Sequence, residues 1–174
     1  MATILKVRMG KVYAGILTRA YTGRMNISPV LAAAYGITAV LLTLILMGLW
    51  MLSGVARARS GVTNNPEDGA KWNKPVQAAD PPSVARVLRA HANAAAVTYP
   101  FLALAAAFTL LNGNVLFAQA LFAAFVVLRL LHAIAYLRSW QPARSIVFAL
   151  SFFALLALAA AVAIRAFHVA AVTT

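Results

Sequence analysis

Four long apolar stretches dominate the chain, and short polar segments separate them. The first stretch runs from Val30 to Val55 and follows Ser28-Pro29. A serine followed by proline favours a helix start, because serine can cap the first turn and proline suits its first position. At about 1.5 Å per residue, about 20 residues cross the roughly 30 Å hydrocarbon core of a bilayer. The pattern predicts an all-α membrane protein with four spans, at about 28–56, 83–111, 115–138 and 143–172.

The segments between these spans carry the breaks expected of loops and turns. A long polar loop, 57–82, follows the first span, and Ser83 is the expected cap of the second. Within the second span, Pro100 should cause a kink because proline removes one backbone hydrogen bond. The Asn-Gly-Asn sequence at 112–114 predicts a tight turn, and Gln141-Pro142 separates the third and fourth spans.

Composition agrees with a single membrane domain. Hydrophobic residues make up 63% of the 174 positions and charged residues only 10%, which excludes an ordinary soluble domain. The chain has no cysteine, which excludes a disulfide framework, a protein thiolate nucleophile and a cysteine-ligated metal. We assign no metal site. Any reactive thiol must therefore arrive on a ligand.

The net charge of +12 reflects 15 Lys and Arg residues against three acids. These cations flank the apolar spans instead of forming a soluble basic face, so nucleic acid is a poor partner and anionic lipid a good one. Residues 1–27 mix basic and apolar side chains, which predicts an amphipathic segment ahead of a membrane domain at 28–172. Arg165 and His168 are expected to reach the interface. All three acids lie in the long loop: Glu67, Asp68 and Asp80.

Cations also bear on membrane orientation. The long loop, the start of the second span and the turn between the third and fourth spans carry eight Lys and Arg residues. The other side has the five cations of the N-terminal segment and Arg165. By a small margin, the positive-inside rule places loop 57–82 in the cytoplasm.

Two polar stripes interrupt the apolar spans. In the second span, Arg89 and Asn93 are four residues apart and share one helical face. In the third, Arg129, His132 and Tyr136 also share a face. Both stripes reach about 15 Å inward from the loop side, so their side chains can meet in one pocket.

Arg144 stands at the loop-side end of the fourth span and completes this group. The predicted pocket contains cations, an amide, a phenol and a histidine but no acid, which suits a small ligand that carries carboxylates or develops negative charge. The structural alternative is that these groups only hydrogen-bond the helices to one another.

Four separated motifs in this sequence resemble one known family. They are Asn65-Pro66-Glu67-Asp68; Arg86-Val87-Leu88-Arg89-Ala90-His91, with Asn93 and Tyr99-Pro100-Phe101-Leu102; Arg129, His132 and Tyr136-Leu137; and Pro142 with Arg144-Ser145. Together they resemble the membrane-associated proteins in eicosanoid and glutathione metabolism (MAPEG), nearest to the microsomal glutathione transferase and microsomal prostaglandin E synthase branch. The match covers residues 28–172.

The resemblance implies a four-helix protomer that assembles as a homotrimer, with glutathione bound between neighbouring protomers near the cytoplasmic face. It assigns a thiolate-stabilising role to Arg144, beside Ser145. It matches Asp68 to a loop acid proposed as a proton-transfer partner, although Asp68 could equally be a helix cap. The positions that match glutathione contacts are Arg57, Arg89, Asn93, His132, Tyr136, Arg144 and Ser145.

The sequence departs from the family pattern at Ala96, where relatives carry a glutamate that receives the amino group of glutathione. Loss of that partner should weaken binding by about 1–3 kcal/mol. Phe148 likewise lacks the phenol that some relatives carry. Two readings stay open: a glutathione transferase or peroxidase that acts on lipophilic electrophiles, and a catalytically lapsed relative that serves as a lipid-binding or scaffold subunit of a larger membrane complex. A transporter is a weaker third interpretation, because the sequence lacks the internal repeat symmetry that transporters usually show.

Overall fold

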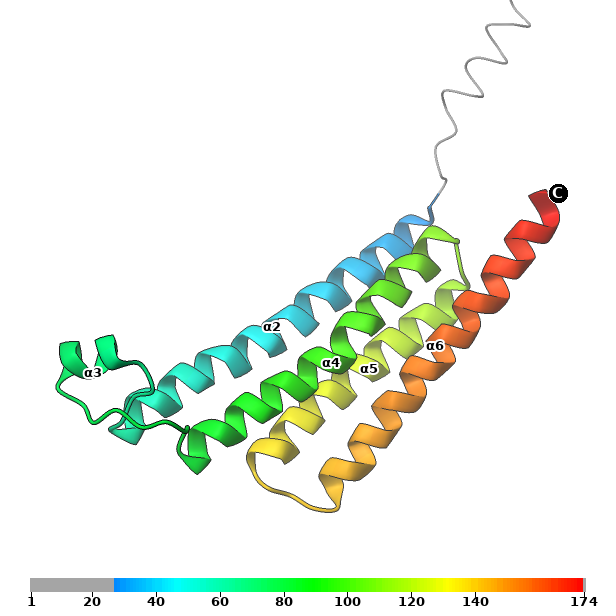
Figure 1. Cartoon of the computed structure of the whole chain (residues 1–174). Helices are drawn as coiled ribbons and strands as arrows, with labels where there is room; N and C mark the ends of the chain where they lie inside the picture. The colour runs from blue at the N-terminus through cyan, green and yellow to red at the C-terminus, as the bar shows by residue number, and fades with distance from the viewer. Residues whose placement is uncertain (1–26, 174) are drawn as a thin grey trace, which may run out of the picture.

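The computed structural model describes residues 27–173, and this part of the chain is helical. Four long helices lie side by side and a short one projects at one end (Figure 1). The four long helices are each long and apolar enough to cross a membrane. This confirms the expected all-helical fold with four candidate spans. The helices are α2 (Pro29–Ser60), α3 (Pro66–Trp72), α4 (Pro82–Leu110), α5 (Val115–Leu137) and α6 (Ala143–Thr173). The N-terminal segment 1–26 lies outside the described residues.

The helix ends differ in places from the expected ones. Helix α2 continues to Ser60, so it includes the first residues assigned to the loop. Helix α4 begins at Pro82 after Pro81, so the expectation that Ser83 caps it is wrong. The reason is that proline at the first helical position has no N–H that needs a cap. Pro100 lies inside α4, which continues to Leu110.

The loop between α2 and α4 is more ordered than its polarity indicates. It contains α3, which begins at Pro66 and ends at Trp72, and the next residue, Asn73, is in the left-handed conformation. Thr63 and Val76 form an isolated bridge that draws the two ends of this segment together. The loop is therefore a compact unit attached to one end of the helices.

Aromatic packing fixes the half of the bundle distant from this loop. The ring of Phe101 on α4 stacks on Phe125 of α5 with centroids 3.6 Å apart, and Phe122 meets its edge at 5.7 Å. Leu42 of α2 and Leu158 of α6 are buried in the same cluster. This cluster joins the four long helices.

Small residues replace the aromatic rings in the loop-side half. Ala90 and Ala94 of α4 and Ala133 of α5 are buried against Leu46 and Leu49 of α2. Small side chains let helices approach closely. The alanines pack α4 against α2 and α5, while the polar stripes of α4 and α5 are left to meet α6.

The turn between α4 and α5 is fastened by hydrogen bonds. Asn112 has φ 54°, and the side chain of Asn114 accepts a hydrogen bond from the backbone of Phe117 at 2.9 Å. Arg165 of α6 donates to the carbonyls of Leu111 and Asn112 at 3.0 and 3.2 Å. Arg165 was expected to reach for the interface. Its guanidinium satisfies carbonyl groups just after the end of α4, and the interfacial position of Arg165 stays a prediction.

Candidate functional site

A cavity of about 300 Å³ lies at the loop-side end of the bundle, between α4, α5 and α6. Asn93 comes from α4, and His132 and Tyr136 come from α5. The first turns of α6 supply the remaining lining residues. The full lining is Asn93, His132, Tyr136, Arg144, Ser145 and Phe148. The structure thus brings together five of the predicted site residues and adds Phe148.

Arg144 and Tyr136 form the mouth of the site. The Arg144 guanidinium carbon lies 4.8 Å from the centre of the Tyr136 ring, in a cation–π contact. Arg144 is the second residue of α6, where the helix dipole adds positive potential. Ser145 donates its hydroxyl hydrogen to Oε1 of Gln141 at 3.1 Å, which leaves its oxygen as an acceptor. This end of the cavity is strongly electropositive.

Arg129 lies behind the lining and is only 1% exposed. One terminal nitrogen, Nη1, donates to the Ser151 hydroxyl at 3.2 Å. The other, Nη2, contacts the Asn93 amide oxygen and Nδ1 of His132, both at 3.4 Å. The buried Nε has no partner among the described residues. A guanidinium with neutral neighbours and an unused donor adds to the positive potential of the cavity.

The same contact fixes the tautomer of His132. Because a guanidinium can only donate, Nδ1 must act as the acceptor. The contact favours the neutral ring that carries its hydrogen on Nε2. Phe148 lies beside it, with ring centroids 5.9 Å apart. His132 thus supplies a neutral N–H donor and not a second cation.

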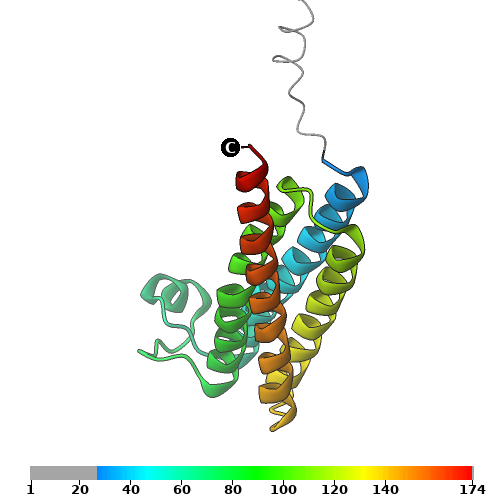
Figure 2. The same cartoon turned by 90° about the vertical axis from the view of Figure 1, so that its right-hand side faces the viewer.

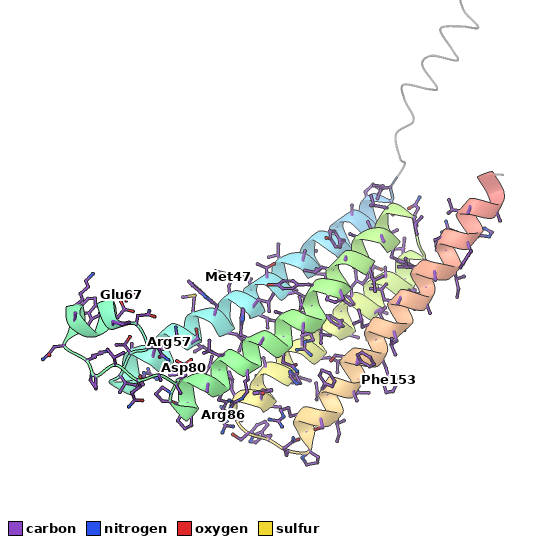
Figure 3. All side chains as sticks on the ribbon, in the orientation of Figure 1. Met47, Arg57, Glu67, Asp80, Arg86 and Phe153 are labelled. Atoms are coloured by element: carbon purple, nitrogen blue, oxygen red, sulfur yellow. The ribbon has the colours of Figure 1, made fainter. Side chains whose placement is uncertain are left out.

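Three predicted site residues do not line the cavity of a single chain. Arg89 is exposed on α4, so the expectation that both polar stripes converge completely is wrong for this residue. Arg57 pairs with Asp80 at 3.3 Å, near the loop end where Arg86 also lies (Figure 3). Asp68 sits in the first turn of α3, where it accepts a hydrogen bond from the Asn65 side chain at 2.9 Å. The N-cap position is Asn65 and Asp68 is the third residue of the helix, so both roles expected of Asp68 stay predictions.

Sequence reasoning missed Ser151 and Gln141. Ser151 is fully buried and holds Arg129, while Gln141 receives the Ser145 hydroxyl. Ser151 is seven residues after Arg144, so it shares the inner face of α6. A serine seven residues after Arg144, within an apolar span, is the sequence feature that could have identified Ser151 as part of the site.

A larger cavity, about 580 Å³, opens at the opposite end of the bundle. Phe108, Phe117 and Ile164 give it an apolar lining, and Arg165 is its main cation. That arginine already donates to two backbone carbonyls. The smaller cavity gathers more polar groups with free hydrogen-bonding capacity, so we take it as the candidate site.

The chain is similar to known proteins over most of its length. Residues 35–164 match the model of the MAPEG family. Prostaglandin E synthases are 34% identical in Homo sapiens and 33% in Macaca fascicularis, each over 125 residues, 71% of this chain and 82% of the relative. The Bos taurus enzyme is 31% identical over 119 residues, 68% of this chain and 78% of its own length. The polar stripes, the four candidate spans and these matches agree: the chain belongs to the MAPEG family of integral membrane proteins.

Proposed function

We propose that this protein is a glutathione-dependent transferase or peroxidase that acts on lipophilic electrophiles at the loop-side cavity. The observation that carries the proposal is the position of Arg144, whose guanidinium faces the cavity and packs on Tyr136. Prostaglandin E synthases among the relatives and a MAPEG match that includes Arg144 support it.

The chain's own residues would bind and polarise the thiol. When bound, glutathione would supply a thiolate sulfur, which bonds to the electrophilic atom of the substrate while the leaving group on that atom, such as a halide, departs with its bonding electron pair. Arg144 favours that ionised sulfur through Coulomb attraction and cannot give up its own proton to cancel the effect. Tyr136 holds the guanidinium in place through its ring face. His132 and Asn93 offer further polar groups deeper in the cavity.

The residues present fit most of glutathione but not all of it. Arg144 and the N–H of His132 suit its carboxylates and its thiolate, and the positive charge of Arg129 lies behind them. The lining has no acid for the amino group, and Ala96 stands where the family glutamate is expected. The cavity therefore favours the anionic parts of the ligand.

We further propose a homotrimer with the loop 57–82 in the cytoplasm. Exposed Arg89, Ala92 and Ala96 form one face of α4, and small residues suit a close contact with a second copy. A neighbouring protomer would bring its own Arg89, and in the same way its Arg57, towards a cavity that neither residue reaches in one chain. The family resemblance supports this arrangement.

Thermal unfolding with glutathione tests the binding proposal. Millimolar glutathione should raise the melting temperature of the protein in detergent, because a ligand that binds the folded state stabilises it. A second assay would measure conjugation of glutathione to an aromatic halide. Arg144→Ala should lower that rate by about 100-fold or more. Arg59→Ala, an exposed cation at the end of α2, is the matched control and should leave the rate unchanged.

A scaffold or lipid-binding subunit is the second candidate. Ala96 and the outward direction of Arg89 in a single chain favour it, because both weaken the case for a complete glutathione site. In that case glutathione at about 10 mM would produce no shift in melting temperature. The conjugation assay would then show no dependence on Arg144.

A further inference from the structure

The loop-side cavity carries an unbalanced positive charge. Arg144 lines it, and Arg129 is buried behind Asn93 and His132. The acceptors that Arg129 contacts are neutral, and its Nε has no partner among the described residues. A buried cation without a counter-ion is costly in a membrane helix. A negatively charged ligand part in the cavity would offset that cost.

The acids of the chain are placed elsewhere. The sequence contains three, and all of them lie between α2 and the start of α4. Asp80 is engaged by Arg57 at 3.3 Å, and Asp68 by Asn65 at 2.9 Å. Glu67 and Asp68 belong to α3, which lies apart from α6 in both views (Figures 1 and 2). None of the three lines the cavity.

An ammonium group in this cavity would therefore have no ionic partner. It would lose part of its hydration and face the like charge of Arg144. A carboxylate or thiolate at the same place would meet the cation Arg144 and hydrogen-bond donors, with no anionic side chain in the lining. The cavity discriminates between ligands by the sign of their charge.

We propose that the cavity takes an anionic thiol whose bound part carries carboxylates and no primary ammonium. A peptide thiol that lacks the α-amino group fits this description better than zwitterionic glutathione. The inference rests on the proposed thiol-binding function and narrows its ligand class. It concerns binding, so it can be measured without turnover.

Calorimetric titration of two probes tests the inference. The probes are glutathione and glutaryl-cysteinyl-glycine, which is the same peptide without the α-amino group. Removal of the repelled ammonium should make the glutaryl peptide bind about 10-fold tighter. Titrations at about 0.15 M and about 0.5 M salt separate site binding from general attraction to the chain, because salt screens exposed charges far more than buried ones.

Variants at Arg144 show whether the tighter binding of the glutaryl peptide arises in the cavity. Arg144→Gln should weaken both peptides and remove the advantage of the glutaryl peptide, whereas Arg144→Lys should retain that advantage. Arg59→Gln, at the exposed end of α2, should change neither affinity. The circular dichroism and melting temperature of each variant would show that it is folded.

The outcomes separate this inference from the proposed function. Equal or tighter binding of glutathione would overturn the inference and leave thiol binding intact. An advantage of the glutaryl peptide that persists in Arg144→Gln would also overturn it, since surface charge would then be the cause. Binding of neither peptide would overturn the thiol-binding function as well.

Discussion

Arg129 lies fully buried in a helix long enough to cross a membrane, among a hydroxyl, an amide and a neutral imidazole. Such a residue either holds helices together or prepares a site for an anion. Its contacts reach α4 through Asn93 and α6 through Ser151, so it does join three helices. Its positive charge and its place behind the cavity favour a second role, the attraction of an anionic ligand.

Arg129→Met separates these two roles. Replacement of a buried charge by an apolar side chain is often neutral or stabilising, and Ser151 keeps its bond to the Phe148 carbonyl at 2.8 Å. We expect the melting temperature without ligand to change by less than about 4 °C, which corresponds to about 1 kcal/mol. The rise in melting temperature that glutathione produces should largely disappear in this variant. A large loss of stability with unchanged protection would show that Arg129 is structural.

Ala96→Glu addresses the departure from the family pattern. The new carboxylate would offer the amino group of glutathione the partner that this chain lacks, so glutathione affinity should increase about 10-fold. Ser83→Glu is the matched control, since it adds the same charge to an exposed site in the first turn of α4. Calorimetric titration would measure both variants. Unchanged affinity in Ala96→Glu would mean that the glutamyl arm lies elsewhere.

At the scale of elements, polar side chains fasten the helix ends where apolar packing stops. Arg57 and Asp80 join the end of α2 to the loop before α4, and Arg86 donates to the Ser139 hydroxyl in the α5–α6 turn. The Arg57–Asp80 pair is exposed, so it adds little stability by itself. Its effect is to hold the segment before α4 against the end of α2.

At the opposite end of the bundle, Arg165 of α6 joins its helix to the α4–α5 turn in a similar way. Arg165→Leu would leave the carbonyls of Leu111 and Asn112 without this donor and should cost about 1 kcal/mol, which lowers the melting temperature by about 2–4 °C. His168→Leu changes an exposed side chain in the same cavity wall and should have almost no effect. Differential scanning calorimetry in detergent would measure both. Equal stabilities would show that water replaces the guanidinium.

At the scale of the whole molecule, one face of α4 has no covering in the single chain. Arg89, Ala92, Ala96 and Tyr99 are exposed along it, although they sit in a helix that can cross a membrane. A cation on a lipid-facing surface is unfavourable. Contact with neighbouring copies would bury Arg89 beside other polar groups.

Native mass spectrometry in detergent tests this assembly. We expect a particle of three chains, and Ala92→Trp should weaken it because a large side chain prevents close helix contact. Ala163→Trp, at an exposed position on α6, is the control and should leave the trimer intact. A single-chain mass for the unaltered protein would contradict the proposal.

The sequence by itself determined the four long helices and the two polar stripes. Bilayer thickness and helical periodicity set both, and these act on local sequence without knowledge of neighbours. Asn93, His132, Tyr136 and Arg144 could therefore be predicted as a group. The short helix α3 escaped prediction because its seven residues, only three of them charged, are too few to show an apolar period.

Tertiary structure alone decided how those residues face one another. It buried Arg129 against Ser151, a residue 22 positions away on another helix, and left Arg89 outside although its stripe looked equivalent. Rotation of a helix about its own axis depends on which neighbours its small and large side chains admit, here the buried alanines of α4 against α2 and α5. Spacing fixes which residues share a face, but only packing fixes what that face meets.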